Sequence, residues 1–109
     1  MKLLIAIIHP EDASNLISEL NENKFPATEI ETKGSFLKTK NVTIFLGVED
    51  KKVDDVLKII RKNCKSRTEY ISPAPSLTEP GEFIMPTSVK VKIGGATVFI
   101  LPVEDFKKL

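Results

Sequence analysis

The sequence is poor in the residue types from which enzymes build reactive centres. Its 109 residues include one cysteine, Cys64, one histidine, His9, and no tryptophan. A single cysteine excludes an internal disulfide, which fits a reducing cytoplasm. The lone histidine lies beside Pro10 at a strand end, where a structural role is more common than a catalytic one, and it has no second metal ligand and no nearby serine or cysteine to activate. Because the Walker, Rossmann, Cys-x-x-Cys and His-Glu-x-x-His patterns are also absent, we expect a protein that is not an enzyme and has no metal or other cofactor.

The sequence also lacks an excess of charge of either sign. Sixteen lysines and arginines stand against fifteen aspartates and glutamates, which gives a formal net charge of +1. Proteins that bind DNA or RNA usually carry a basic surplus that pairs with many phosphates. We therefore expect no nucleic-acid partner.

The apolar run at residues 3–8 is too short to cross a membrane. It follows a lysine and ends at His9 and Pro10, and it has no small-residue cleavage site behind it. A spanning helix needs about 20 apolar residues. We interpret the run as a buried, central strand, and we expect a cytoplasmic protein with no membrane partner.

What remains is the composition of a globular protein, 41% hydrophobic and 28% charged. The length supports one hydrophobic core, so we expect a single domain over residues 1–109. A short loop is predicted at residues 34–41 and a long, proline-rich one at residues 73–87. Because residues 83–85 are large and apolar, a lid or partner-binding arm is favoured there over simple disorder.

Hydrophobic spacing predicts the helices and strands. One helix is expected at residues 11–23, and a second follows Glu49 and Asp50, which supply its N-cap and first-turn acids. The buried stripe of the second helix comprises Val53, Val56, Leu57, Ile60 and Cys64. Strands are expected at residues 3–8, 28–32, 42–48, 68–72, 89–93 and 96–101. The last two strands are predicted to form a hairpin at Gly94 and Gly95. On the helical stripe, Cys64 is interpreted as a small buried hydrophobe rather than a nucleophile.

The order strand, helix, strand, strand, helix, strand is typical of the α+β class. It predicts a ferredoxin-like fold, here with an extra C-terminal hairpin strand. Two helices would cover one face of an antiparallel sheet and leave the other face bare. Since a bare face exposes a large apolar surface, we expect identical copies to associate through their sheets.

Residues 28–48 form the stretch with the strongest functional signal, two strands flanking the loop at 34–41. The stretch combines a glycine, an aromatic ring, two cations and an amide: Gly34, Phe36, Lys38, Lys40 and Asn41. These groups suit a nucleotide, and they also occur in ordinary solvated hairpin turns. Gly47, inside a strand, fits either close approach of a ligand or a bulge or packing device.

Short matches to one known family run nearly from end to end of the chain. They are the opening strand, Phe25, Ala27-Thr28, residues 32–37, Asn41, Gly47-Val48, residues 94–99 and Pro102-Val103. At these positions the chain resembles the P-II-like cyclic di-AMP receptor proteins, relatives of the nitrogen-regulatory P-II trimers. The resemblance implies a homotrimer that binds cyclic di-AMP at its subunit interfaces and signals to a protein partner of unknown identity.

By position, the resemblance implies nine ligand-binding residues: Thr28, Gly34, Ser35, Phe36, Leu37, Asn41, Gly47, Phe99 and Lys108. Asn41 can donate and accept hydrogen bonds at an adenine edge, and Phe36 can cover a base. Backbone amides near Gly34 and Leu37 can meet phosphate.

Three positions depart from the family pattern. Pro26 stands in place of an arginine, Ser35 in place of a glycine and Lys108 in place of a glutamine. Lys38, Lys40 or Lys108 can replace the lost charge, and changed specificity or weaker affinity fits the sequence equally. Two alternatives therefore stay open: a trimeric protein-interaction module that binds another nucleotide or no ligand, and a trimer resembling the divalent-cation tolerance proteins, for which metal ligands are scarce.

Overall fold

The structure, a computed structural model, describes residues 1–32, 41–71 and 89–109. The elements are, in order, β1 (Lys2–Ile8), α1 (Pro10–Glu22), β2 (Thr28–Thr32), β3 (Asn41–Val48), the 3-10 helix η1 (Asp50–Lys52), α2 (Val53–Asn63), β4 (Arg67–Ile71), β5 (Val89–Ile93) and β6 (Ala96–Pro102). Two helices with antiparallel sheets confirm the predicted α+β class. The arrangement is consistent with a ferredoxin-like fold.

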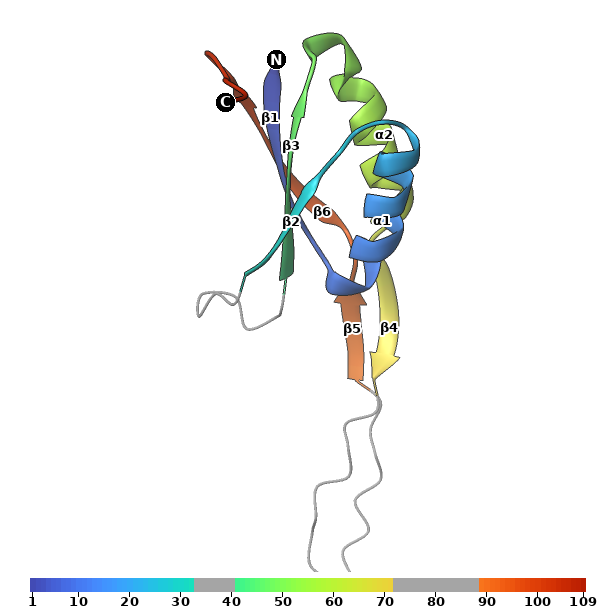
Figure 1. The fold of residues 1–109 in the computed structure, drawn as a ribbon. Helices are drawn as coiled ribbons and strands as arrows, with labels where there is room; N and C mark the ends of the chain where they lie inside the picture. Colours follow the sequence, from blue (N-terminus) through green and yellow to red (C-terminus); the bar gives the residue numbers. More distant parts are fainter. Residues whose placement is uncertain (33–40, 72–88) are drawn as a thin grey trace, which may run out of the picture.

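The larger sheet has the strand order β2-β3-β1-β6, and all of its neighbouring strands are antiparallel. The apolar first strand therefore lies in the interior of the sheet, as its composition predicts. Helices α1 and α2 lie side by side over one face of this sheet (Figure 1). The other face carries no helix of the described part of the chain.

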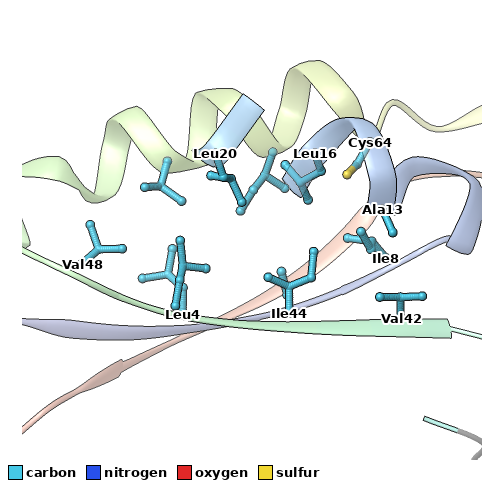
Figure 2. Packing of buried hydrophobic residues seen from close by; sticks show 13 residues of the cluster. Leu4, Ile8, Ala13, Leu16, Leu20, Val42, Ile44, Val48 and Cys64 are labelled. Carbon is cyan, nitrogen blue, oxygen red and sulfur yellow. The ribbon is translucent and has the colours of Figure 1, made fainter. Parts of the chain in front are cut away.

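The core fills the layer between the helices and the larger sheet (Figure 2). Its buried members come from β1, α1, β3 and α2, and they include Leu4, Ile8, Ala13, Leu16, Leu20, Val42, Ile44, Val48 and Cys64. Burying one leucine or isoleucine side chain contributes roughly 1.5–3 kcal/mol, so this layer is the main stabilising element. Cys64 is 4% exposed, which confirms its interpretation as a buried hydrophobe.

His9 has the structural role that its position beside Pro10 indicated. Its Nδ1 accepts a hydrogen bond from the Glu11 backbone N–H at 3.3 Å, and the residue is the N-cap of α1. Pro10 follows in the first turn of the helix, where its missing N–H has no cost.

The predicted cap of the second helix is wrong. Glu49 precedes a 3-10 turn and makes no side-chain capping bond. Asp50 instead forms an ion pair with the α-amino group of Met1 at 2.9 Å. A nearby cation attracts this carboxylate more strongly than neutral amides do, and the acids in the first turn of α2 are Asp54 and Asp55.

The predicted hairpin of residues 89–93 with 96–101 is also wrong. β5 pairs with β4 in a separate two-stranded sheet, whereas β6 pairs with β1. The last strand, β6, is instead the edge strand of the larger sheet, beside β1. Gly94 and Gly95, with φ of 85° and 81°, carry the chain from one sheet to the other. A Cβ at Gly94 would lie 2.2 Å from the Lys65 carbonyl oxygen, so this turn requires glycine there.

No helix in the described ranges combines the length and apolar character needed to cross a membrane.

Candidate functional site

The face of the larger sheet that points away from the helices carries every second residue of its four strands, and we call it the open face. The pairing register aligns one row across it: Phe99, Ile5, Phe45 and Thr28. A neighbouring row aligns Leu101, Leu3 and Gly47. The open face therefore gathers two candidate site residues in its central row and a third in the next.

The open face is apolar and exposed in the single chain. Phe99 is 52% exposed, Ile30 42% and Leu101 41%. Continuous apolar patches of this kind are uncommon on soluble monomers and mark surfaces that another molecule covers. The sequence of β6 indicates this patch. Residues 98–101 are all apolar, so apolar side chains lie on both faces of the strand.

Thr28, Asn41, Gly47 and Phe99 all lie on the open face, but they do not meet in one pocket of the single chain. Asn41 and Gly47 are six residues apart on β3, which is about 20 Å along an extended strand. Thr28 and Phe99 lie on the two edge strands, three strand spacings or about 14 Å apart. These four candidate residues are therefore spread over the open face of one chain.

Lys108 lies in the exposed tail that follows β6. The Val103 backbone N–H donates to the Met1 carbonyl at 3.2 Å, so the tail leaves the sheet beside the start of β1 (Figure 1). Asn41 is at the opposite end of the sheet, where β3 begins next to the end of β1. A single copy therefore separates Lys108 from Asn41.

Four predicted site residues, Gly34, Ser35, Phe36 and Leu37, lie outside the described residues. So do the predicted loop at 73–87 and the loop at 34–41 apart from Asn41.

Gly47 has the most informative surroundings of the described candidates. The ladder between β1 and β3 runs without interruption through the Leu3–Gly47 pair, so the bulge interpretation is wrong. A Cβ at this position would meet the Met1 Sδ at 3.7 Å, an ordinary contact distance. Among the described residues, neither pairing nor packing requires glycine here, which favours close approach of another molecule.

Two hollows of the described chain lie away from the open face. One of about 400 Å³ is bounded by the second half of α2 and the start of β6, and one of about 440 Å³ lies beside Phe25 and Lys58. Neither is lined by a predicted site residue.

The sequence did not predict a charge cluster that attaches the smaller sheet. Arg67, at the start of β4, forms ion pairs with Asp12 at 3.1 Å and Glu11 at 3.3 Å, both in the first turn of α1. Asp12 is only 6% exposed, and the Arg67 guanidinium is its partner of opposite charge. The Gly95 backbone N–H adds a 2.6 Å hydrogen bond to the Cys64 carbonyl. The cluster fixes where β4 and β5 leave the body of the protein.

The described residues offer little reactive chemistry. Burial, with a further contribution from the charge of Asp12, raises the pKa of the Cys64 thiol to about 11, so the thiol is protonated at neutral pH. His9 is engaged as a helix cap. Within the described ranges, no cluster of three or more His, Cys, Asp or Glu is placed to hold a metal ion.

The family model for cyclic-di-AMP receptors matches the whole chain, residues 1–109. The chain belongs to the cyclic-di-AMP receptor family. This is the P-II-like family that its motifs resemble. A receptor family implies ligand binding in signalling rather than catalysis, and it suggests cyclic di-AMP as the ligand.

The fold of this receptor family member is similar to the crystal structure of a protein of unknown function from Pediococcus pentosaceus. The two share 35% sequence identity with a TM-score of 0.75. The alignment covers 99% of this chain and 96% of that one.

Proposed function

We propose that the protein is a non-enzymatic signalling receptor that binds cyclic di-AMP at the subunit interfaces of a homotrimer. In this proposal residues 1–109 form one domain, and the segments at 34–41 and 73–87 respond to the ligand. The observation that carries the proposal is the match of the whole chain to the cyclic-di-AMP receptor family.

The geometry of the open face supports a site shared between copies. Phe99, Ile30 and Leu101 are exposed in one chain, and association of copies would cover them. Because Lys108 and Asn41 lie at opposite ends of the sheet, only residues of different copies can bring both against one ligand. The proposed site combines Thr28, Gly34, Ser35, Phe36, Leu37, Asn41, Gly47, Phe99 and Lys108.

Phe36 gives the proposal a direct test by mutation. Stacking of a base on an aromatic ring contributes about 1–3 kcal/mol, so Phe36→Ala is expected to weaken binding of cyclic di-AMP by about tenfold or more. Titration calorimetry of both proteins measures the change. Phe36→Tyr retains the ring and is the matched control, and equal affinities for Phe36→Ala and wild type would remove Phe36 from the site.

Ligand identity is tested by calorimetry with cyclic di-AMP, cyclic di-GMP, ATP and AMP. We expect heat of binding with cyclic di-AMP and much weaker binding with the other three. If the folded protein gives no heat of binding with cyclic di-AMP at millimolar concentration, the assignment of cyclic di-AMP as the ligand is wrong. Sedimentation of the same samples tests the homotrimer separately.

A trimeric protein-interaction module that binds another nucleotide or no ligand is the second candidate. It is favoured by Pro26, which lies two residues before Thr28 and lacks the donors of the arginine expected there. This candidate predicts the same Tm with and without cyclic di-AMP, whereas any ligand of the native state raises it.

A further inference from the structure

Strands β2 and β5 each have one edge without a partner among the described residues. β2 is one of the two outer strands in the order β2-β3-β1-β6, and β5 pairs with β4 alone among the described strands. Both strands have five residues, Thr28–Thr32 and Val89–Ile93. An open strand edge presents unpaired N–H and C=O groups, which favour pairing with another strand.

The two edge strands carry opposite charges at the same spacing. Glu29 and Glu31 flank Ile30 in β2, and Lys90 and Lys92 flank Val91 in β5. Glu29, Lys90 and Lys92 are exposed, and within the described part of the chain no ion pair involves any of these three side chains. Ile30 is 42% exposed although it is large and apolar.

An antiparallel alignment over the full length of both strands matches these residues. Glu29 then lies opposite Lys92, and Glu31 lies opposite Lys90. Both charge pairs share one face, and Ile30 meets Val91 on the other face. Opposite charges in such cross-strand pairs are stabilising, and like charges are destabilising. All strand pairs of the described chain are likewise antiparallel.

The two edges cannot meet within one chain. β5 leads through Gly94 and Gly95 into β6, which forms the edge of the larger sheet opposite to β2. Strands β3 and β1 therefore lie between β2 and β6, the strand into which β5 leads. The matching strand must therefore come from a second copy.

We propose that β2 of one copy pairs antiparallel with β5 of a second copy, with Glu29 opposite Lys92 and Glu31 opposite Lys90. The proposal rests on the homotrimer proposed above and specifies one of its contacts. Each copy uses β2 toward one neighbour and β5 toward the other, a head-to-tail contact that closes into a ring. The pairing also sets Thr28, a proposed ligand residue, opposite Ile93 of the second copy.

Disulfide trapping tests the pairing and its register. The double variant Glu29→Cys with Lys92→Cys places two thiols directly opposite each other, and both positions are exposed. Glu29→Cys with Lys90→Cys is the matched control, because these positions are diagonal in the antiparallel register and directly opposite in a parallel one. The native Cys64 is buried and does not compete.

After mild oxidation, the first variant is expected to give covalent dimers and trimers on a non-reducing gel, and the control to remain monomeric. Co-expressed single variants, Glu29→Cys in one chain and Lys92→Cys in the other, are expected to give covalent dimers, which shows that the link joins two copies. Cross-linking of the control alone would overturn the antiparallel register.

Sedimentation of the reduced proteins separates failure of this inference from failure of the proposed function. A trimer without cross-linking in any variant would overturn the strand pairing and leave the proposed homotrimer intact. A monomer at all concentrations would overturn both.

Charge reversal tests the ion pairs themselves. Glu29→Lys with Glu31→Lys, and separately Lys90→Glu with Lys92→Glu, are each expected to raise the concentration needed for assembly by about tenfold or more, because like charges then face each other. The variant with all four changes keeps the net charge at +1 and is expected to regain wild-type assembly. Failure of the fourfold variant to recover would overturn the charge pairing.

Discussion

The described part of the chain does not explain why residue 47 is a glycine. Its strand pairing is regular and the space above it accepts a Cβ. Gly94 is the opposite case, because its positive φ and the nearby Lys65 carbonyl require glycine. Folding therefore requires glycine at position 94, whereas the proposed ligand contact is the reason we offer for glycine at position 47.

Gly47→Ala is expected to leave the free energy of unfolding unchanged or to raise it by up to about 1 kcal/mol, because alanine lowers the conformational entropy of the unfolded chain. The same change is expected to weaken binding of cyclic di-AMP by about tenfold, since a methyl group would hold the ligand off the strand. Thermal unfolding and calorimetry measure the two effects. Gly94→Ala is the control and should destabilise the protein strongly; unchanged affinity of Gly47→Ala would contradict a ligand contact.

Lys24 is the non-glycine residue with positive φ, 63°, among the described residues. It follows the C-cap of α1, where the Phe25 N–H donates to the Leu20 carbonyl at 2.8 Å. Glycine is preferred at such a position because it has no Cβ. Lys24→Gly should therefore add about 1 kcal/mol of stability and raise the Tm by about 4–8 °C. Lys24→Ala keeps the Cβ and should show no such rise in the same thermal melt.

Single-residue roles could be predicted where a local pattern determines them. The helical stripe identified Cys64 as buried, and the proline beside His9 indicated a structural role. The pairs Asp12–Arg67 and Met1–Asp50 were missed because their members are far apart in sequence and carry no pattern. Only the folded chain brings them together.

At the scale of elements, α1 and α2 are joined by a polar contact at the edge of their apolar interface. Glu19 accepts hydrogen bonds from Lys62 Nζ at 2.5 Å and from Asn63 Nδ2. The hydrogen bond from Lys62, followed by that from Asn63, lowers the pKa of Glu19 below its ordinary value of 4.5. The ionised form is therefore favoured by the folded state.

This pKa shift predicts a loss of stability in acid. A carboxyl group with a lowered folded-state pKa stabilises the protein fully above its unfolded pKa, and the contribution disappears as pH falls through the folded pKa. The free energy of unfolding of wild type should therefore exceed that of Glu19→Gln by a constant amount above about pH 5, and the difference should shrink below about pH 4.5. Urea titrations from about pH 3 to pH 7 measure it. Glu22→Gln, on the same helix, is the control; a difference that grows in acid would contradict the assignment.

Strand and helix positions were predicted closely, but strand partners were not. Alternating apolar residues identify residues 89–93 as a strand, and the two glycines after it suggest a tight hairpin. Pairing depends on which edge is available in three dimensions. The central β1 offers its edge to β6, β4 pairs with β5, and the Arg67 cluster attaches β4 to α1, so the glycines join two sheets instead.

At the scale of the whole molecule, the open face predicts how copies associate. Leu101 on the open face and Ile100 on the opposite face are neighbours with similar exposure, 41% and 46%. Leu101→Glu is expected to shift the protein to monomers, because it would bury a charge without a partner in the assembly. Ile100→Glu is the matched control and is expected to remain a trimer. Sedimentation velocity compares the two, and an unaffected Leu101→Glu trimer would exclude the open face as the contact.

The exposed apolar face of the larger sheet was predictable, because one sheet face had no segment to cover it. The distances between the candidate site residues were not, because the resemblance names residues without giving their positions in the sheet. Only the pairing register shows that Thr28 and Phe99 lie on opposite edges of one sheet.

The pairing of β1 with β6 has a consequence for biosynthesis. Lys2 lies opposite Pro102 and Ile8 opposite Ala96, so β1 is synthesised long before β6, the strand that pairs with it. Until residue 102 has left the exit tunnel, one edge of an isoleucine-rich strand stays without its partner and is open to aggregation. Such distant contacts also slow folding, so a message truncated before this final strand should yield chains that chaperones retain or proteases remove.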